Sequence, residues 1–476
     1  MNGHKAPRPK LIAALVGNWV GLFGLLVATC GLFAALCLIA IDFFHGFRQP
    51  YMGILVYLIV PSFVWMGLIF MGVGVWLELR RRKKPAEAEA RVEASGARRT
   101  RQLATALAAV FLFLMLSALG SYRAFEVTES PQFCGALCHT VMKPEYTAYK
   151  ISPHSRVRCT ECHIGPGASW FVRSKLSGTR QLFAVAFHTY SRPIPSPVKY
   201  LRPARETCEQ CHWPQRFTGD KFLVKEKFQD DEKNTKLTTV LVLKIGGVTW
   251  QGRVGIHGRH LETASRIHYI SIDPERMIIP VVNYVTDTGK TITFVSSEIK
   301  TTPEQLAKGE HREMDCVDCH NRPTHTFEMP ESAVDKQMAT GQISPELPFV
   351  KKKAVELLKA NYPDREAARQ SIIQGLDDFY RTGYPQVYAT RGALVQQSAE
   401  EIAAIYSRNI FPSMRLDWGT HPNNIGHMES PGCFRCHDGS HTSADGQTIP
   451  NDCSTCHSLL AMEEPNPKVL AELGMN

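Results

Sequence analysis

The sequence has almost no cysteine outside one repeated pattern, and this scarcity limits what its cysteines can do. Of the 14 cysteines, twelve belong to six Cys…Cys-His units, and only Cys30 and Cys37 remain, both inside an apolar segment. Zinc sites combine Cys-x-x-Cys pairs or add spaced histidines, and they do not need a histidine directly after every second cysteine. We therefore expect neither a zinc fold nor a disulfide framework, and we interpret the two leftover cysteines as small buried hydrophobic residues.

The chain also lacks a broad basic surface. Its formal net charge is +9, but residues 80–101 alone hold nine Lys or Arg against three Glu. That segment carries +6, which leaves only +3 for the rest of the chain. Nucleic-acid binding needs a basic face or stripe, so nucleic acid is excluded as an expected partner.

Three long stretches contain hardly any charge, at residues 11–44, 51–77 and 103–119. A membrane-spanning helix needs about 20 apolar residues, within a range of roughly 17–25. The first two stretches exceed this length, and the third reaches it when extended to Tyr122. The first stretch is too long for the apolar part of a signal peptide and has no small-x-small cleavage pattern after it. The sequence thus predicts three retained transmembrane helices.

The basic residues predict the orientation of these helices. Lys5, Arg8 and Lys10 precede the first stretch, and the strongly basic segment 80–101 separates the second from the third, whereas the loop between the first and second holds only Arg48. Loops rich in Lys and Arg stay in the cytoplasm. We therefore expect a bacterial inner-membrane protein with a cytoplasmic N-terminus and everything after Ser121 in the periplasm.

Each Cys…Cys-His unit predicts one covalently bound haem. Cys-x-x-Cys-His is the attachment signature of c-type haem, because the two thiols reach the two vinyl groups of one porphyrin and the adjacent imidazole lies under the iron. Five units have this form and the first is widened by one residue; we expect six haem c groups in all. In chain order the units are motif 1 (Cys134, Cys138, His139), motif 2 (Cys159, Cys162, His163), motif 3 (Cys208, Cys211, His212), motif 4 (Cys316, Cys319, His320), motif 5 (Cys433, Cys436, His437) and motif 6 (Cys453, Cys456, His457).

The second axial ligand of each iron must come from outside the motifs. A neutral imidazole is the usual donor, although any single histidine could instead be an ordinary surface or core residue. The segment GIHGRH holds His257 and His260 beside glycines that let the backbone approach a ligand, and we select His257 from it. Met142, just after motif 1, is the candidate for the first haem, with gap-filling as its alternative role. The histidines selected as distal ligands are His154, His257, His325, His427 and His441.

The remaining sequence predicts the fold class. Residues 221–297 contain runs rich in Val, Ile and Thr, which favour strands, whereas 345–361 and 365–381 have helical apolar periodicity. We expect an α-helical membrane anchor of three transmembrane helices plus a loop-rich, mainly helical multihaem c domain with a small β insert. The expected domains are the anchor (1–121), a haem domain with motifs 1–3 (122–220), the β-rich insert (221–300) and a C-terminal haem domain with motifs 4–6 (301–476).

The motif order resembles that of the NapC/NirT/NrfH family of membrane-anchored quinol dehydrogenases. The segments that carry the resemblance lie within 103–214 and 314–325, and they are FCGALCHTVMKPEYTAYKISPHSRVRCTECHIGPG, ARETCEQCHWP and MDCVDCHNRPTH. The resemblance implies quinol oxidation at the outer membrane face and electron transfer along the haems to a periplasmic partner. It places Met142 and His154 near haems and Lys175 near the quinol. The three-helix start and the GHMESPGCFRCHDGSH ending are similar to inner-membrane multihaem cytochromes of metal-reducing bacteria.

The chain departs from that family in having three helices and six motifs where members commonly have one helix and four haems. No Asp or Glu lies between His163 and Glu206, so Glu145 or His188 is the expected proton acceptor at the quinol site.

The leading expectation is a menaquinol-oxidising cytochrome of anaerobic respiration. It would draw on the membrane quinone pool and pass electrons from motifs 5 and 6 to periplasmic c-type cytochromes, as a possible oligomer. The alternatives are a terminal reductase of a small oxyanion, disfavoured because no Cys-x-x-Cys-Lys motif occurs, and a passive carrier docked to another quinol-oxidising subunit.

Overall fold

A computed structural model describes residues 18–45, 59–81, 96–137, 139–165, 167–198, 201–213, 219–249, 252–261, 267–286 and 288–475. The chain divides into two compact units, which we describe separately. The anchor unit comprises the residues up to Ser130 together with Ile164–Thr179. The motif unit comprises Pro131–His163 and Arg180–Asn476, and it holds all six motifs.

Among the described residues of the anchor unit, three helices are long and apolar enough to cross a membrane. They are α2 (Trp19–His45), α4 (Val60–Arg81) and α5 (Gly96–Thr128). This confirms the predicted three-helix anchor. The unit also includes the first two thirds of α8 (Ala168–Ala186), whose Val172 and Leu176 are exposed.

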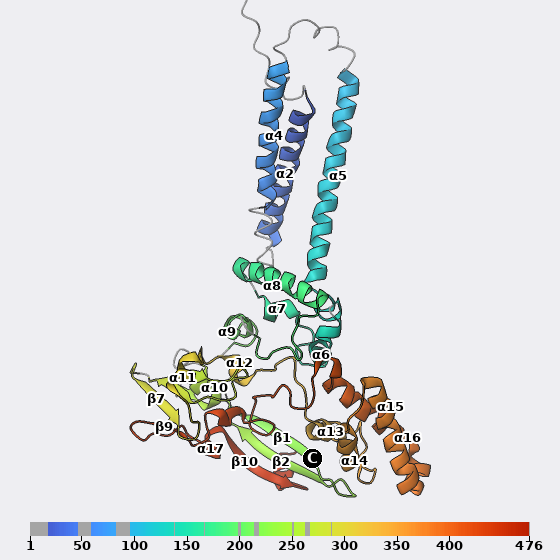
Figure 1. The fold of residues 1–476 in the computed structure, drawn as a ribbon, viewed down its shortest axis with the longest axis vertical. Coiled ribbons are helices and arrows are strands. Elements are labelled where there is room, and N and C mark those ends of the chain that lie inside the picture. The colour runs from blue at the N-terminus through green and yellow to red at the C-terminus, as the bar shows by residue number, and fades with distance from the viewer. Residues whose placement is uncertain are drawn as a thin grey trace, which may run out of the picture. The chain divides into compact units, whose positions relative to one another are not determined.

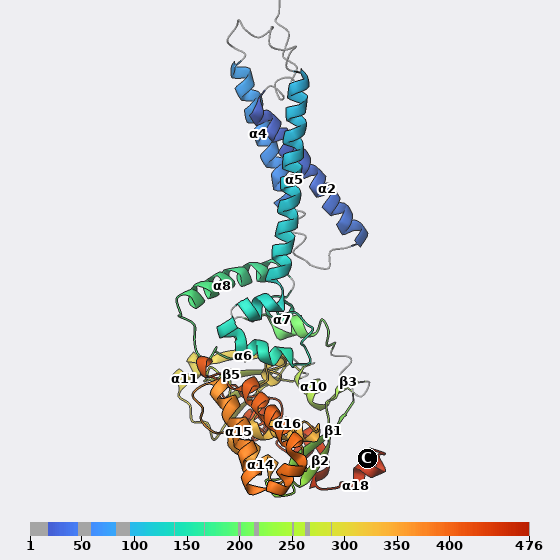
Figure 2. The same cartoon turned by 90° about the vertical axis from the view of Figure 1, so that its right-hand side faces the viewer.

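Glycines allow α2 and α4 to lie side by side (Figures 1 and 2). A Cβ atom added at Gly67 of α4 would lie 2.4 Å from the backbone nitrogen of Ala28 in α2. Asn18 closes one end of this contact, since its Nδ2 donates to the Gly74 carbonyl at 2.6 Å. Helices in lipid associate through such close packing of small residues, because the hydrophobic effect does not drive two helices together inside a bilayer.

The motif unit contains three antiparallel sheets that reach beyond the expected β insert. β2 pairs with β10, which begins at His457 of motif 6, and β7 pairs with β9, which begins at His441. The sheets therefore fasten the C-terminal segment to residues 221–300. Their strand orders are β1-β2-β10, β3-β4 and β8-β5-β6-β7-β9. The strands are β1 (Lys221–Phe228), β2 (Lys236–Leu243), β3 (Gly247–Thr249), β4 (Gly252–Val254), β5 (Ile267–Ser271), β6 (Val281–Val285), β7 (Thr291–Ser296), β8 (Glu310–Glu313), β9 (His441–Ser443) and β10 (His457–Glu464).

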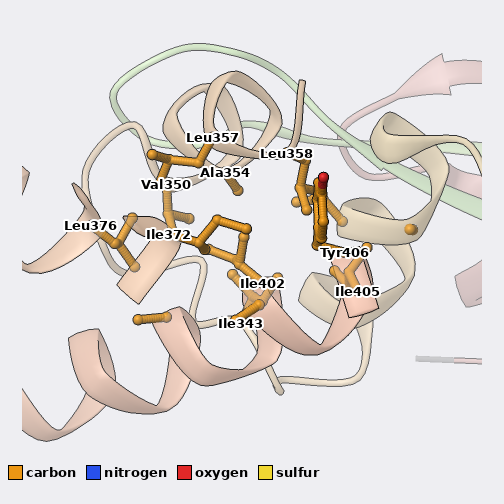
Figure 3. Close-up of a cluster of buried hydrophobic side chains, with 14 of the residues drawn as sticks. Ile343, Val350, Ala354, Leu357, Leu358, Ile372, Leu376, Ile402, Ile405 and Tyr406 are labelled. Atoms are coloured by element: carbon orange, nitrogen blue, oxygen red, sulfur yellow. The ribbon is translucent and has the colours of Figure 1, made fainter. Parts of the chain in front are cut away.

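The largest apolar core of the motif unit lies among helices that carry no motif. They are α13 (Pro330–Ala339), α14 (Val350–Leu358), α15 (Arg365–Gly383) and α16 (Pro385–Asn409), which gather in one helical cluster between motifs 4 and 5 (Figure 1). Leu358, Ile372 and Ile402 are fully buried in its centre (Figure 3). This cluster needs no cofactor to form a core.

The motifs themselves lie on short elements and loops. This agrees with the predicted loop-rich character of the haem-binding region. The remaining elements are η2 (Phe133–Leu137), α6 (His139–Lys150), α7 (Cys159–His163), α9 (Ala204–Cys208), α10 (Gly255–His260), α11 (Pro303–Lys308), α12 (Cys316–Cys319), η5 (Pro412–Met414), η6 (Gly432–Arg435), α17 (Cys453–Cys456) and α18 (Lys468–Glu472).

The α2–α4 contact can be tested with two glycines of the same helix. We expect Gly67→Leu to destabilise the anchor by about 1–3 kcal/mol, because the new side chain meets the α2 backbone. Gly72→Leu is the matched control, since a Cβ there has no atom within 4 Å. The measurement is the temperature at which half of the detergent-solubilised protein leaves the monodisperse peak in size-exclusion chromatography. Equal temperatures for the two variants would contradict the close helix contact.

Candidate haem centres

Each of motifs 2 to 6, which the structure describes in full, folds into one turn that brings its first cysteine and its histidine to the same side. In motif 4 the His320 amide donates to the Cys316 carbonyl at 2.8 Å, and in motif 3 the His212 amide donates to Cys208 at 2.7 Å. The same bond joins His437 to Cys433 at 3.0 Å. Residues four apart in such a turn lie one above the other. Thiol and imidazole can therefore reach the edge and the centre of the same planar group.

Five motif histidines have described side chains, and each of them faces a histidine from outside the motifs. No histidine outside the motifs is used twice among these pairs. The distances between ring centres are 6.2 Å for His163 and His325, 5.9 Å for His212 and His154, 6.3 Å for His320 and His257, 5.8 Å for His437 and His260, and 6.3 Å for His457 and His427.

This spacing fits one iron between each pair. Two metal–nitrogen bonds of about 2 Å each, plus roughly 1 Å from each nitrogen to its ring centre, place axial imidazoles about 6 Å apart. Ordinary aromatic pairs also have centres about 4.5–7 Å apart, so one pair alone would decide nothing. Five separate pairs, each joining one motif histidine to a different outside histidine, match a set of haem ligands.

Backbone carbonyls hold several of these rings with one nitrogen free. Nδ1 of His325 lies 2.9 Å from the Glu145 carbonyl oxygen. Nδ1 of His260 lies 2.8 Å from the Ile256 carbonyl oxygen, and Nδ1 of His154 lies 3.2 Å from the Pro323 carbonyl oxygen. A ring that donates through Nδ1–H keeps Nε2 unprotonated for a metal. Burial lowers the pKa of His325 to about 4, so this imidazole is neutral, the form that binds iron.

The structure places four of the five selected histidines opposite a motif histidine, but it places His441 elsewhere. His441 is fully buried, and both of its ring nitrogens have partners, Nδ1 at 2.8 Å from Asp438 Oδ1 and Nε2 at 2.8 Å from the Ile279 carbonyl. His260 occupies the position opposite His437 instead. The sequence held a signal for this, because residues three apart in a helical turn share a face, and His257 and His260 are so spaced.

Motif 1 is only partly described. Cys138 and the side chain of His139 lie outside the described residues. Cys134 is half-buried, and Met142 is half-buried in α6, three residues after His139. Residues three apart on a helix share a face, which keeps Met142 near this motif.

The cysteines of successive motifs are neighbours. A hydrogen bond with Cys134 lowers the pKa of Cys159 to about 7, and a hydrogen bond with Cys316 lowers that of Cys208. The pKa of Cys162 is raised, mainly by burial and next by the charge of Cys208. Burial and the charge of Cys433 raise the pKa of Cys319 to about 12. The same two causes raise the pKa of Cys456. These hydrogen bonds and charge interactions indicate that the cysteines of successive motifs lie near one another, in chain order from motif 1 to motif 6.

A buried carboxylate fixes motif 4 to its surroundings and to motif 5. Asp318, which is 3 % exposed, accepts hydrogen bonds from Tyr269 Oη at 2.5 Å and from Arg312 Nε at 3.2 Å. Arg435, inside motif 5, donates to the Asp318 carbonyl and, at 2.8 Å, to that of Arg276. Motifs 4 and 5 are thus held together by protein groups alone.

The residues selected for a quinol site lie in different units. Lys175, in α8 of the anchor unit, forms an ion pair at 3.2 Å with Glu129, whose side chain is 6 % exposed. Glu129, which precedes motif 1 in the sequence, was not among the expected proton acceptors Glu145 and His188. In the motif unit, Glu145 is buried with Oε2 at 3.3 Å from His325 Nδ1, and burial raises its pKa. His188 is exposed, with its ring centre 6.4 Å from that of Tyr190.

The role of Asp318 can be tested by removing its charge. We expect Asp318→Asn to destabilise the haem-loaded protein by about 1–3 kcal/mol, because an amide NH2 group cannot accept a hydrogen bond and both carboxylate oxygens of the buried Asp318 are acceptors. Asp445→Asn is the control, since Asp445 is 65 % exposed. The measurement is thermal unfolding followed by circular dichroism of the haem bands. A midpoint for Asp318→Asn equal to that of the control would refute the clamp.

Comparison with known proteins agrees with this geometry. Residues 97–194 match the model of the NapC/NirT cytochrome c family, N-terminal region. The chain is 39 % identical over 458 residues to the cytochrome c-type protein ImcH of Geobacter sulfurreducens, covering 95 % of this chain and 90 % of the relative. No solved structure matches the chain. The chain therefore belongs to the NapC/NirT cytochrome c family and is a membrane-bound, electron-transferring cytochrome with covalently bound haem c.

Proposed function

We propose that this cytochrome is a six-haem menaquinol dehydrogenase of the inner membrane. The observation that carries the quinol step is the Lys175–Glu129 ion pair. The set of five histidine pairs supports the electron-transfer role, because it fits low-spin irons that exchange electrons without binding substrate. Each haem would supply reversible one-electron chemistry, while the protein sets its position, ligands and potential. The twelve motif cysteines attach the haems, and the six motif histidines are the proximal ligands.

The distal ligands follow from the pairs. His325 serves motif 2, His154 motif 3, His257 motif 4, His260 motif 5 and His427 motif 6; we keep Met142 for motif 1, on its spacing from His139 and on the family resemblance. Because both ligands of motifs 2 to 6 are protein side chains, none of these irons offers an open position. This disfavours the reductase alternative, which needs substrate bound to iron.

The neighbouring cysteines of successive motifs indicate the route that electrons would follow from haem to haem. Contacts in chain order support electron transfer from motif 1 to motif 6. His257 and His260 lie one turn apart on α10, so the irons of motifs 4 and 5 are held by a single six-residue element. Because both distal ligands come from α10, the haems of motifs 4 and 5 would be neighbours. Electrons would leave from motifs 5 and 6 to a periplasmic c-type cytochrome.

The Lys175–Glu129 pair is the proposed quinol site. Oxidation of a quinol releases two electrons and two protons, so the site needs a hydrogen-bond donor for a ring oxygen and a proton acceptor. The Lys175 ammonium supplies the first and the Glu129 carboxylate the second. Val172 and Leu176 expose apolar side chains on the same helix as Lys175, which suits a helix at a lipid surface. The basic segment 80–101 supports a periplasmic location for this site.

Glu145 and His188 have other surroundings. Glu145 lies against His325, so we assign it to that ligand rather than to the quinol. His188 is exposed beside Tyr190, and we propose no proton transfer for it. A passive carrier that receives electrons from another subunit stays the second candidate, since the histidine pairs fit it equally well. Only the Lys175–Glu129 pair favours direct quinol oxidation.

The choice between His260 and His441 as the ligand of motif 5 makes a sharp test. We expect His260→Ala to convert one of the low-spin haems to high spin, because its iron loses an axial imidazole. His441→Ala should keep every low-spin signal, because the His441 ring nitrogens face Asp438 and Ile279. The measurement is electron paramagnetic resonance of the oxidised protein. High-spin signal in His441→Ala alone would reverse the assignment.

Quinol oxidation is tested by anaerobic reduction of the haems with a menaquinol analogue. We expect Glu129→Gln to slow reduction about 10²-fold, the typical contribution of a proton acceptor, and Lys175→Ala to weaken quinol binding. Lys308→Ala, on the exposed face of α11, is the control, and dithionite should reduce all variants fully. No reduction of the unmodified protein by quinol, with dithionite still effective, would leave only the carrier.

A further inference from the structure

Arg322 is a buried cation with one unused edge. The residue is 7 % exposed, yet Nε and Nη2 are buried without a hydrogen-bond partner among the residues that the structure describes. The third nitrogen, Nη1, lies 3.5 Å from Ser196 Oγ and 4.0 Å from Glu145 Oε1. The guanidinium therefore has the Glu145 carboxylate near Nη1, but no hydrogen-bond acceptor among the described residues for Nε and Nη2.

A buried guanidinium with two unpaired nitrogens destabilises the fold unless an acceptor binds those nitrogens. The penalty for a buried, unpaired charge is several kcal/mol, even after the surroundings relax. Nε and Nη2 point from the same edge of the planar group, and two parallel N–H donors on one edge match the two oxygens of a carboxylate. The chemistry that fits this edge is a carboxylate bound through both oxygens.

The position of Arg322 indicates which carboxylate. It lies two residues after His320 of motif 4 and three before His325, whose ring faces His163 of motif 2. Its Nη1 also faces Glu145, which contacts His325. Arg322 therefore sits beside the ligands of motif 2.

A second unpartnered group lies close by. His421 is 9 % exposed, and its Nε2 is buried without a partner. The Phe327 ring joins the two residues, with its centre 5.3 Å from the Arg322 guanidinium carbon and 6.0 Å from the His421 ring centre. His421 Nε2 is therefore a second buried nitrogen near Arg322, and in the tautomer that carries Nε2–H it would be a hydrogen-bond donor.

We propose that Arg322, with His421, binds a propionate of the haem held between His163 and His325. This rests on the proposed axial pair of motif 2. Each haem c carries two propionates, and Glu145, at 4.0 Å from Nη1, faces another part of the guanidinium. The bound carboxylate fixes the rotation of this haem in its plane, and the Arg322 charge favours its reduced form.

The test compares Arg322→Gln, Arg322→Lys and Glu145→Gln in the haem-loaded protein, with Arg369→Gln in the motif-free helical cluster as control. Resonance Raman spectroscopy follows the propionate bending bands, and a potentiometric titration follows the six haems. We expect Arg322→Gln to shift the bands of one haem and to lower its potential. Arg322→Lys should shift the bands but keep the potential closer to that of the unmodified protein, because it keeps the charge and loses the two-point contact.

Glu145→Gln separates the two possible partners of Arg322. We expect it to leave the propionate bands unchanged. The proposal is overturned if Glu145→Gln reproduces the band shift of Arg322→Gln, or if neither Arg322 variant moves the bands. Should Arg322→Gln fail to assemble, Arg322→Lys alone decides. Low-spin signals of the unmodified protein report the axial pairs independently, so failure of the motif 2 pair is recognised separately.

Discussion

The motif unit depends on one constraint, that the two imidazoles paired at each of motifs 2 to 6 stand about 6 Å apart, as one iron between them would require. The partners are far apart in the sequence: His163 meets His325, and His260 meets His437. Each pair therefore closes a long loop of chain, and the proposed iron–histidine bonds would offset the loss of chain entropy. Segments that are too short and too polar to form a core alone are ordered by these closures.

Regions without motifs contain the apolar core and the sheets that stabilise the motif unit, whereas the short motif turns have no such core of their own. The α13–α16 cluster has a continuous apolar core, and the sheets tie the C-terminal motifs to residues 221–300 through β9 and β10. Asp318 and Arg435 join motifs 4 and 5 directly. Protein contacts thus fix the motif turns relative to one another, which sets the distances that electron transfer needs.

The sequence was sufficient wherever the chemistry is local. Motif spacing predicted haem attachment, and apolar length predicted the three-helix anchor. Distal ligands depend on tertiary structure, which nearness in sequence does not give. At His441, strand β9 pairs with β7, and the ring nitrogens lie within hydrogen-bond distance of Asp438 and of the Ile279 carbonyl. The proposed role of Glu129 also depends on tertiary structure, because this residue precedes motif 1 in sequence but lies beside Lys175 in space.

Buried charge links the ligand geometry to redox behaviour. Glu145 and Arg322 lie beside the His163–His325 pair, where the low dielectric makes each charge act more strongly than at the surface. A cation there favours the reduced iron and an anion the oxidised iron, so the two residues oppose each other. Since Arg322 also has an edge that Glu145 does not fill, the balance is complete only with a further carboxylate. The haem itself brings that group, which makes the cofactor part of the charge pairing that sets its own potential.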